Sequence, residues 1–148
     1  SILVLDERVG EIARRRLAVT PPATGRPIVF VGFGCSAFGG AGYGTKRTGT
    51  NEIDFFGANV DGADQARFAH TFGWHSKPLA SLDGGTPNDD ANICPGDSGG
   101  PTFWQEDGKP VLAGVHTLVG PTFGYSCQVS ENRAWIDSQL AKLEPVRD

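Results

Sequence analysis

Glycine and proline recur so often along most of this chain that the segments between them are short. The 148 residues include 21 glycines and 10 prolines, and the apolar runs between them are short. Both residue types disfavour the interior of regular elements and favour turns. Short apolar runs separated by turn residues are typical of an all-β barrel or sandwich. A chain of this length is also long enough for one domain with a core of its own.

Seven segments have the apolar composition expected of strands. They are residues 2–5, 27–33, 50–55, 67–74, 102–105, 111–117 and 125–129. The dipeptide Asp107-Gly108 lies between the fifth and the sixth of these segments. Because Asp-Gly suits the positive φ angles of a tight hairpin, these two strands are predicted to pair.

A single helix is predicted near the end of the chain, over residues 131–143. Ser130 is a suitable residue to cap its first turn. Ile136, Leu140 and Leu143 follow at helical spacing and form one apolar stripe. We therefore expect an all-β domain that ends in one amphipathic helix.

Composition and short motifs exclude several classes of protein. The net charge of -4 argues against nucleic-acid binding, and no apolar run reaches the length of a membrane span. Residues 32–37 match G-x-G-x-x-A, but the following Phe38-Gly39-Gly40 does not continue into the helix that a dinucleotide site requires. The aspartates of the loop at 82–93 do not have EF-hand spacing. No cofactor and no metal site is predicted.

The segment of residues 94–101, Cys-Pro-Gly-Asp-Ser-Gly-Gly-Pro, carries the chemistry of the chain. A serine hydroxyl becomes a good nucleophile only when a base takes its proton. It also needs backbone N–H groups nearby to hold the oxyanion that develops. Gly96 and Gly99 flank Asp97-Ser98 and allow the tight backbone path that exposes such N–H groups. Ser98 is therefore the candidate nucleophile.

This segment resembles the GDSGGP signature of the trypsin/chymotrypsin family of serine peptidases. Three weaker similarities to the family, at residues 31–34, 112–117 and 130–136, occur in the same order along the chain as in the family. The resemblance implies an antiparallel six-stranded Greek-key barrel, the second barrel of a trypsin-like double barrel, followed by a C-terminal helix. Residues 1–25 are then the last strand of the first barrel and a connector, and residues 26–148 are the second barrel with its helix.

The resemblance assigns roles to the residues of the signature. Ser98 is implied as the nucleophile, and the backbone N–H groups of Gly96 and Ser98 as the oxyanion hole. Asp97 is implied as the buried acid that pairs with a new N-terminus after zymogen cleavage. Cys94 and Cys127 are implied as the disulfide that braces the specificity pocket, which leaves Cys35 over.

Substrate contacts are implied as well. Thr117, Leu118 and Val119 correspond to the strand that binds an extended substrate through its backbone. The pocket floor lies six residues before the nucleophile, at Asn92, with Ile93 as an apolar wall. An uncharged floor leaves a buried guanidinium unpaired, so small or medium uncharged side chains are expected in preference to Arg and Lys.

The catalytic histidine and aspartate of the family both precede the region that this chain resembles. His70, His75 and His116 do not match the family's histidine context, and a structural or surface role is expected for each. The chain begins with Ser1 and contains no methionine, so we expect a processed product or a piece of a longer protein. An N-terminal half of the same protease is the expected partner, and a protein or peptide the expected substrate.

Two alternatives were weighed against this interpretation. Residues 96–100 also satisfy G-x-S-x-G, but the prolines on both sides oppose the strand and helix that an α/β-hydrolase requires. A non-catalytic trypsin-like binding module remains the second candidate, although the intact nucleophile segment favours the peptidase. A structural disulfide requires an oxidising compartment, so a secreted or cell-surface location is expected.

Overall fold

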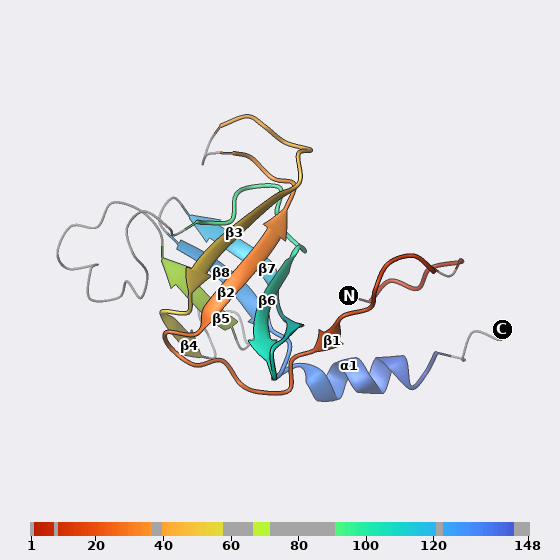
Figure 1. Ribbon diagram of the computed structural model, residues 1–148. Coiled ribbons are helices and arrows are strands. Elements are labelled where there is room, and N and C mark those ends of the chain that lie inside the picture. The colour runs from red at the N-terminus through yellow and green to blue at the C-terminus, as the bar shows by residue number, and fades with distance from the viewer. Residues whose placement is uncertain are drawn as a thin grey trace.

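The computed structural model describes residues 2–7, 9–36, 40–57, 67–71, 91–120 and 123–143. These residues form eight strands and one helix (Figure 1). The elements in chain order are β1 (Arg16–Leu17), β2 (Pro27–Gly32), β3 (Arg47–Glu52), β4 (Phe55–Gly57), β5 (Arg67–Thr71), β6 (Pro101–Glu106), β7 (Lys109–Gly120), β8 (Phe123–Gln128) and α1 (Arg133–Leu140).

The strands form one sheet in the order β3-β2-β6-β7-β8-β5-β4, and every neighbouring pair along this path is antiparallel. Only Ile53 and Asp54 separate β3 from β4 along the chain, so the two ends of the path belong to one segment. In addition, β3 contacts β5. This order is the one expected of a six-stranded barrel in which β3 and β4 form one broken strand. The predicted all-β antiparallel architecture with a C-terminal helix is confirmed.

The predicted hairpin is present between β6 and β7. Asp107 and Gly108 have φ angles of 51° and 70°, the left-handed region that a two-residue turn of this kind requires. The pairing of Glu106 with Lys109 places the turn at the predicted dipeptide. The local turn chemistry therefore fixed the register of this pair of strands.

The core lies inside the curved sheet. In β2, the side chains alternate, so that Ile28 and Phe30 are buried while Val29 is exposed. Trp104 of β6 and Val111 of β7 are buried in the same cluster. Alternation of this kind is what a strand shows when one face packs on a core and the other meets solvent.

Residues 2–5 were predicted to form a strand, and the structure has no strand there. Leu3 is 87% exposed, and Val4 and Leu5 are also exposed. A strand requires a neighbouring strand for its hydrogen bonds, and no described segment pairs with these residues. Their assignment to a preceding barrel stays a prediction. The end of the predicted strand at 67–74 and the loop aspartates at 83, 89 and 90 lie outside the described residues.

Helix α1 is shorter than the predicted helix and begins at a different cap. Asn132, not Ser130, is the N-cap residue, and its side chain donates to the Gln128 carbonyl instead of capping the first turn. No residue of α1 is buried. The helix extends away from the sheet, alongside the arm formed by residues 2–15 (Figure 1). The predicted apolar stripe therefore contacts no core in the described part of the chain.

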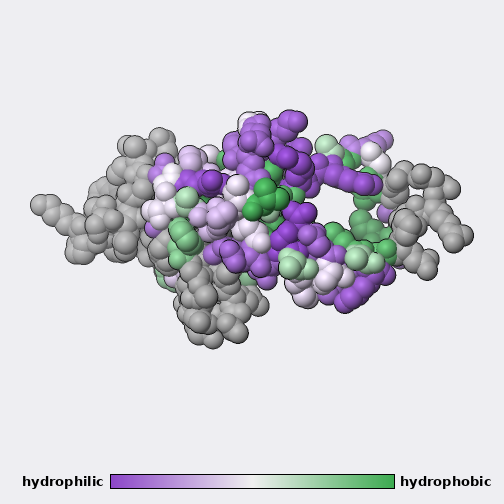
Figure 2. Space-filling view, turned by 90° about the horizontal axis from the view of Figure 1, so that it is seen from below, coloured by the Kyte–Doolittle hydropathy of each residue, from purple (hydrophilic) through white to green (hydrophobic). Residues whose placement is uncertain are grey.

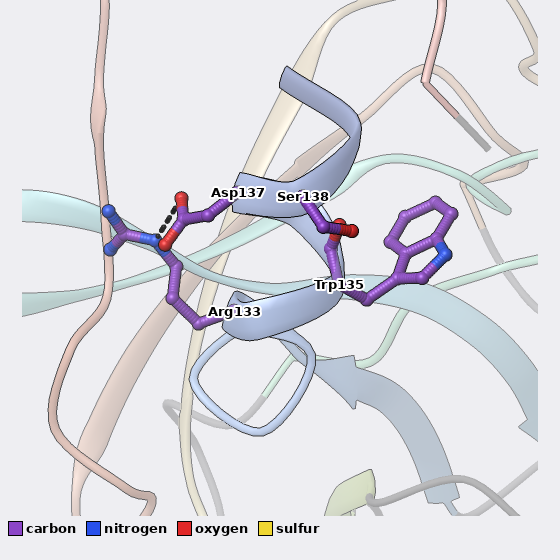
Figure 3. Close-up of polar contacts among 4 residues, drawn as sticks. All are labelled: Arg133, Trp135, Asp137 and Ser138. Carbon is purple, nitrogen blue, oxygen red and sulfur yellow. Dashed lines mark hydrogen bonds and ion pairs between the residues drawn. The ribbon is translucent and has the colours of Figure 1, made fainter. Parts of the chain in front are cut away.

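The polar contacts among Arg133, Trp135, Asp137 and Ser138 lie within α1 itself (Figure 3). Arg133 and Asp137 form an ion pair at 2.9 Å, and the Ser138 hydroxyl donates to the Trp135 carbonyl. The Trp135 ring points away from this ion pair and is 49% exposed. Where the arm and α1 leave the sheet, the surface is open, with hydrophobic residues at the rim of the gap (Figure 2). No helix in the described ranges is long and apolar enough to cross a membrane.

Candidate active site

The segment with the candidate nucleophile is a tight loop that leads into β6. Gly96 and Gly99 have φ angles of 96° and 83°, a conformation that residues with a side chain rarely adopt. Between them, Ser98 is exposed at the tip of the loop. The two glycines that the sequence singled out are therefore required by the backbone path on both sides of Ser98.

The carboxylate of Asp97 holds the loop against the end of β2. One carboxylate oxygen accepts a hydrogen bond from the N–H of Gly34 at 2.6 Å, and the other accepts from the N–H of Cys94 at 2.8 Å. A Cβ on Gly34 would lie 2.7 Å from the Asp97 Cγ, and one on Gly32 would lie 2.5 Å from the same atom. Glycine is therefore required at both positions for the carboxylate to approach the backbone. The family resemblance at residues 31–34 includes both glycines, but the sequence alone does not show that they make room for the Asp97 carboxylate.

A disulfide joins the same two segments. Cys35 is bonded to Cys94, with their Cα atoms 5.4 Å apart, and the N–H of Cys35 donates to the Pro95 carbonyl. The predicted pairing of Cys94 with Cys127 is wrong, and Cys127 takes no part in this disulfide. The physical reason is register, since Cys127 pairs with Val115 and Arg67 inside the sheet while Cys35 directly follows the glycines that receive Asp97.

The backbone N–H groups of the loop divide into two sets. Those of Cys94, Asp97, Gly99 and Gly100 all donate hydrogen bonds within the described structure. The N–H groups of Gly96 and Ser98 donate to none of the described residues. These two groups are the ones that the family resemblance implies as the oxyanion hole. An oxyanion site requires available N–H donors of this kind next to the attacking serine.

His116 lies in the barrel interior, behind the loop. Its backbone accepts from the N–H of Gly99 and donates to the Gly100 carbonyl, at 3.0 and 2.9 Å. The ring atom Nδ1 lies 3.1 Å from the Asp97 carbonyl oxygen, which only accepts, so Nδ1 carries the hydrogen in this contact. The ring also packs edge-on against Phe30.

The environment of His116 disfavours a role as the catalytic base. Burial lowers the pKa of His116, although the contact with the Asp97 carbonyl opposes this effect. The side chain is 2% exposed, and Nε2 is buried without a hydrogen-bond partner in the described structure. The ring is thus held inside the barrel while Ser98 faces outward. Of the other two histidines, His70 belongs to β5, and His75 lies outside the described residues.

Strand β7 runs past the end of its neighbour β6. The last pair of this ladder is Pro101 with Val115, and beyond it β7 pairs with β8 alone among the described strands. Among the described strands, none therefore pairs with the other edge of β7 from Thr117 to Gly120. The register shift between His116 and Leu118 leaves Thr117 without a partner residue in β8, and its hydroxyl donates to the Tyr125 carbonyl. An open strand edge of this kind is suited to an extended peptide.

The two residues implied for the specificity pocket lie in different environments. Asn92 is partly exposed, and its Nδ2 donates to the carbonyls of Gly120 and Phe123, at 3.0 and 3.3 Å. Ile93 is buried and belongs to the core cluster. Val119 of β7 packs against the same cluster. Within the described ranges, no group of three or more His, Cys, Asp or Glu side chains is placed to hold a metal ion.

A cleft of about 920 Å³ begins at Ser98 and runs along β2 and β6 to the arm. Ile12 and Arg15 line it on the arm side, and Phe103 lines it on the sheet side. Ser98 therefore opens onto a large concave surface and not onto a flat face.

Barrel and loop together define the class of trypsin-like β-barrel proteins with a serine at the nucleophile position. A family model described as Trypsin matches residues 7–136, and the chain belongs to the trypsin family. The sequence matches none of the curated proteins with which it was compared.

Two of the solved structures that are similar to this chain are structures of heparin binding protein. One is a mutant of human heparin binding protein (CAP37), and the other is an atomic-resolution structure of HBP. Each is 18% identical with a TM-score of 0.55, and the match covers 90% of this chain. It covers 53% and 52% of those chains, so this chain spans about half of their length. At this identity, the likeness shows the fold alone.

Proposed function

We propose that this chain is the nucleophile-bearing half of a serine endopeptidase and that Ser98 forms the acyl-enzyme. The observation that carries the proposal is the loop itself. Ser98 is exposed between two left-handed glycines, and the N–H groups of Gly96 and Ser98 donate to no described residue. The anchored Asp97 holds this arrangement before any substrate binds.

The reaction follows from the positions of these groups. The Ser98 hydroxyl gives its proton to a base while its oxygen bonds to the substrate carbonyl carbon. The negative charge on the carbonyl oxygen is held by the N–H groups of Gly96 and Ser98. The C–N bond then breaks, and the base returns the proton to the leaving amine. Water hydrolyses the resulting ester by the same steps and frees Ser98.

The base is proposed to come from an N-terminal half of the same protease, which supplies a histidine and an aspartate. Two observations support this. The described surface next to Ser98 is a cleft of about 920 Å³ that is large enough to receive side chains from another domain. The arm and α1 expose apolar side chains, among them Leu3, Val4 and Trp135, which a partner domain can cover.

The substrate is proposed to be an extended peptide that lies along the open edge of β7. Thr117, Leu118 and Val119 belong to this stretch of β7, which is proposed to supply the backbone groups that bind the peptide. Extended peptides bind such edges through main-chain hydrogen bonds, with alternate side chains directed to pockets. Because the trypsin fold and the disulfide suit an oxidising compartment, a secreted or cell-surface location is proposed.

A non-catalytic binding module is the second candidate. One similar structure is that of human heparin binding protein, and heparin is a polyanion. This chain has a net charge of -4, which does not favour a polyanion. The peptidase therefore remains the better-supported proposal.

The test is to produce this chain together with its N-terminal half and to measure peptide cleavage. The proposal predicts turnover by the two-half protein and loss of turnover in Ser98→Ala. The Ser98→Ala variant is matched, because it removes one exposed hydroxyl and leaves the loop's hydrogen bonds in place. Absence of turnover in a folded two-half protein with an intact disulfide contradicts the proposal.

A further inference from the structure

Arg47 begins a chain of hydrogen bonds that ends at one of the N–H groups implied for the oxyanion hole. Its Nη1 atom donates to the Gly34 carbonyl at 3.1 Å. The N–H of the same peptide unit belongs to Cys35 and donates to the Pro95 carbonyl at 3.2 Å. The Pro95 carbonyl in turn shares its peptide unit with the N–H of Gly96. We infer, on the basis of the proposed peptidase function, that Arg47 is a positioning residue that orients and polarises the Gly96 N–H.

Holding the Pro95 carbonyl fixes the direction of the Gly96 N–H. A peptide unit is planar and trans, so its carbonyl and its N–H point in opposite directions. The Pro95 carbonyl is turned toward the end of β2, where it accepts from Cys35. The Gly96 N–H is therefore turned the other way, and it donates to none of the described residues. Rotation of this peptide unit would break the bond to Cys35 and turn the donor away from a substrate oxygen.

The two segments that this chain of hydrogen bonds joins are in close contact. A Cβ on Gly34 would lie 2.8 Å from the Pro95 carbonyl oxygen, and one on Gly96 would lie 3.2 Å from the Gly34 Cα. The disulfide between Cys35 and Cys94 links the same two segments covalently. The chain of hydrogen bonds therefore runs through packed backbone, and only its first donor is a side chain.

The position of Arg47 allows it to supply a positive charge to this chain of hydrogen bonds. Arg47 is the first residue of β3, pairs with Gly32 of β2 and is half-buried. Its Nη1 also donates to the Thr45 carbonyl at 3.2 Å, which holds the guanidinium at this end of the sheet. An ionised donor makes a stronger hydrogen bond than a neutral one, and hydrogen bonds in a chain polarise one another. Arg47 therefore strengthens donation by the Gly96 N–H as negative charge develops on the substrate oxygen.

The effect of Arg47 is expected to be smaller than that of a direct donor. Removal of one oxyanion donor costs roughly 10²–10³-fold in kcat. Loss of the Arg47 side chain leaves the Gly96 N–H in place, but less firmly oriented and less polarised. Arg47→Ala is therefore expected to lower kcat about tenfold and to leave KM within about twofold of the wild-type value, because the oxyanion forms only in the transition state.

The experiment compares an ester and a thionoester of the same acyl group as substrates of the two-half protein. Sulfur accepts hydrogen bonds weakly, so the thionoester gains little stabilisation from the Gly96 N–H. Arg47→Ala should lower kcat about tenfold for the ester and less than about twofold for the thionoester. Arg47→Lys keeps a cation with N–H donors, and its ester rate should recover toward that of the wild type.

Arg26→Ala is the matched control. Arg26 is also half-buried, and its Nη1 also donates to an oxygen, the Thr20 hydroxyl, at 3.0 Å. It precedes β2, at the end of that strand far from Gly32. Both its ester rate and its thionoester rate should equal those of the wild type. Circular dichroism and a thiol count are used to verify that each variant is folded with its disulfide intact.

A fluorophosphonate, which phosphorylates a reactive serine, separates this inference from the proposed function. Absence of labelling at Ser98 in the wild-type two-half protein overturns the proposed function, and the inference with it. When the wild type is labelled, an ester rate of folded Arg47→Ala within about threefold of the wild-type rate overturns the role of Arg47 alone. An equal loss for the ester and the thionoester also overturns it, because Arg47 would then only hold the loop in shape. If Arg47→Ala does not fold, Arg47→Gln is judged by whether its loss is confined to the ester.

Discussion

Replacing Asp97 with asparagine tests how strongly the nucleophile loop depends on its anchor. The change keeps size and shape but removes the charge and one acceptor. In the native loop, the two carboxylate oxygens accept from the N–H groups of Gly34 and Cys94, at 2.6 and 2.8 Å. In the variant, the amide oxygen keeps one of these bonds, and the NH2 group faces the other N–H.

The expected cost follows from the two bonds. A hydrogen bond to a charged group contributes roughly 1.5–3 kcal/mol and a neutral one roughly 0.5–1.5 kcal/mol. One bond therefore weakens by about 1 kcal/mol, and the other, worth about 2 kcal/mol, is lost. The sum of about 3 kcal/mol corresponds to roughly a hundredfold lower population of the competent loop, and so to slower labelling of Ser98.

The assay is the rate at which a fluorophosphonate labels Ser98 in the two-half protein, with circular dichroism to show that the barrel is folded. Gly34→Ala affects the same contact from the other side, because its Cβ would lie 2.7 Å from the Asp97 Cγ. Both variants should slow labelling by a similar factor. Labelling of a folded Asp97→Asn protein within threefold of the wild-type rate would refute the reasoning.

Three further predictions follow from other contacts. Under denaturing, non-reducing conditions, the chain should show one titratable thiol, from Cys127, and a count of three thiols would contradict the disulfide. The Cys35→Ser variant loses a crosslink between residues that are 59 positions apart in the sequence. In denaturant titration, this loss should lower the free energy of unfolding by about 4 kcal/mol. Burial raises the pKa of Glu106, but hydrogen bonds from Thr20, Trp104 and Val19 outweigh it, so the net pKa lies below the ordinary 4.5. The stability that Glu106 contributes is thus present above pH 4.5 and lost as the pH falls through the folded-state pKa, a loss absent from acid titrations of Glu106→Gln. Leu140 is 45% exposed, so Leu140→Ser should change the free energy of unfolding of this chain by less than about 0.5 kcal/mol. A larger loss of stability would mean that Leu140 packs against a hydrophobic core, in contradiction to its exposure.

Features that depend on neighbouring residues were predicted well. The turn at Asp107-Gly108 and the loop around Ser98 are both set by residues next to one another, because the required positive φ angles belong to glycines and to Asp107, residue types that tolerate them. The family resemblance then supplied the order in which these pieces assemble.

Features that depend on register between distant segments were not predicted. Cys94 has two possible disulfide partners in the sequence, Cys35 and Cys127. Only the position of the Ser98 loop beside β2 decides that Cys35 is the partner. The family resemblance implies that Asn92 is the floor of the specificity pocket, because it lies six residues before Ser98. Its hydrogen bond to the Gly120 carbonyl could not be predicted, because that bond depends on the length of the β7–β8 hairpin. The stripe on α1 has helical spacing, but spacing alone does not show what covers it.

Mass spectrometry of the fluorophosphonate adduct on this chain, with and without its N-terminal half, is the decisive measurement. The two-half protein should carry one adduct, on Ser98, and Ser98→Ala should carry none. The chain alone should react far more slowly, because His116 is buried behind the loop and a triad without its base retains little reactivity. Equally fast labelling of the chain alone, or an adduct at a residue other than Ser98, would contradict the assignment of Ser98 as a nucleophile that depends on an N-terminal half.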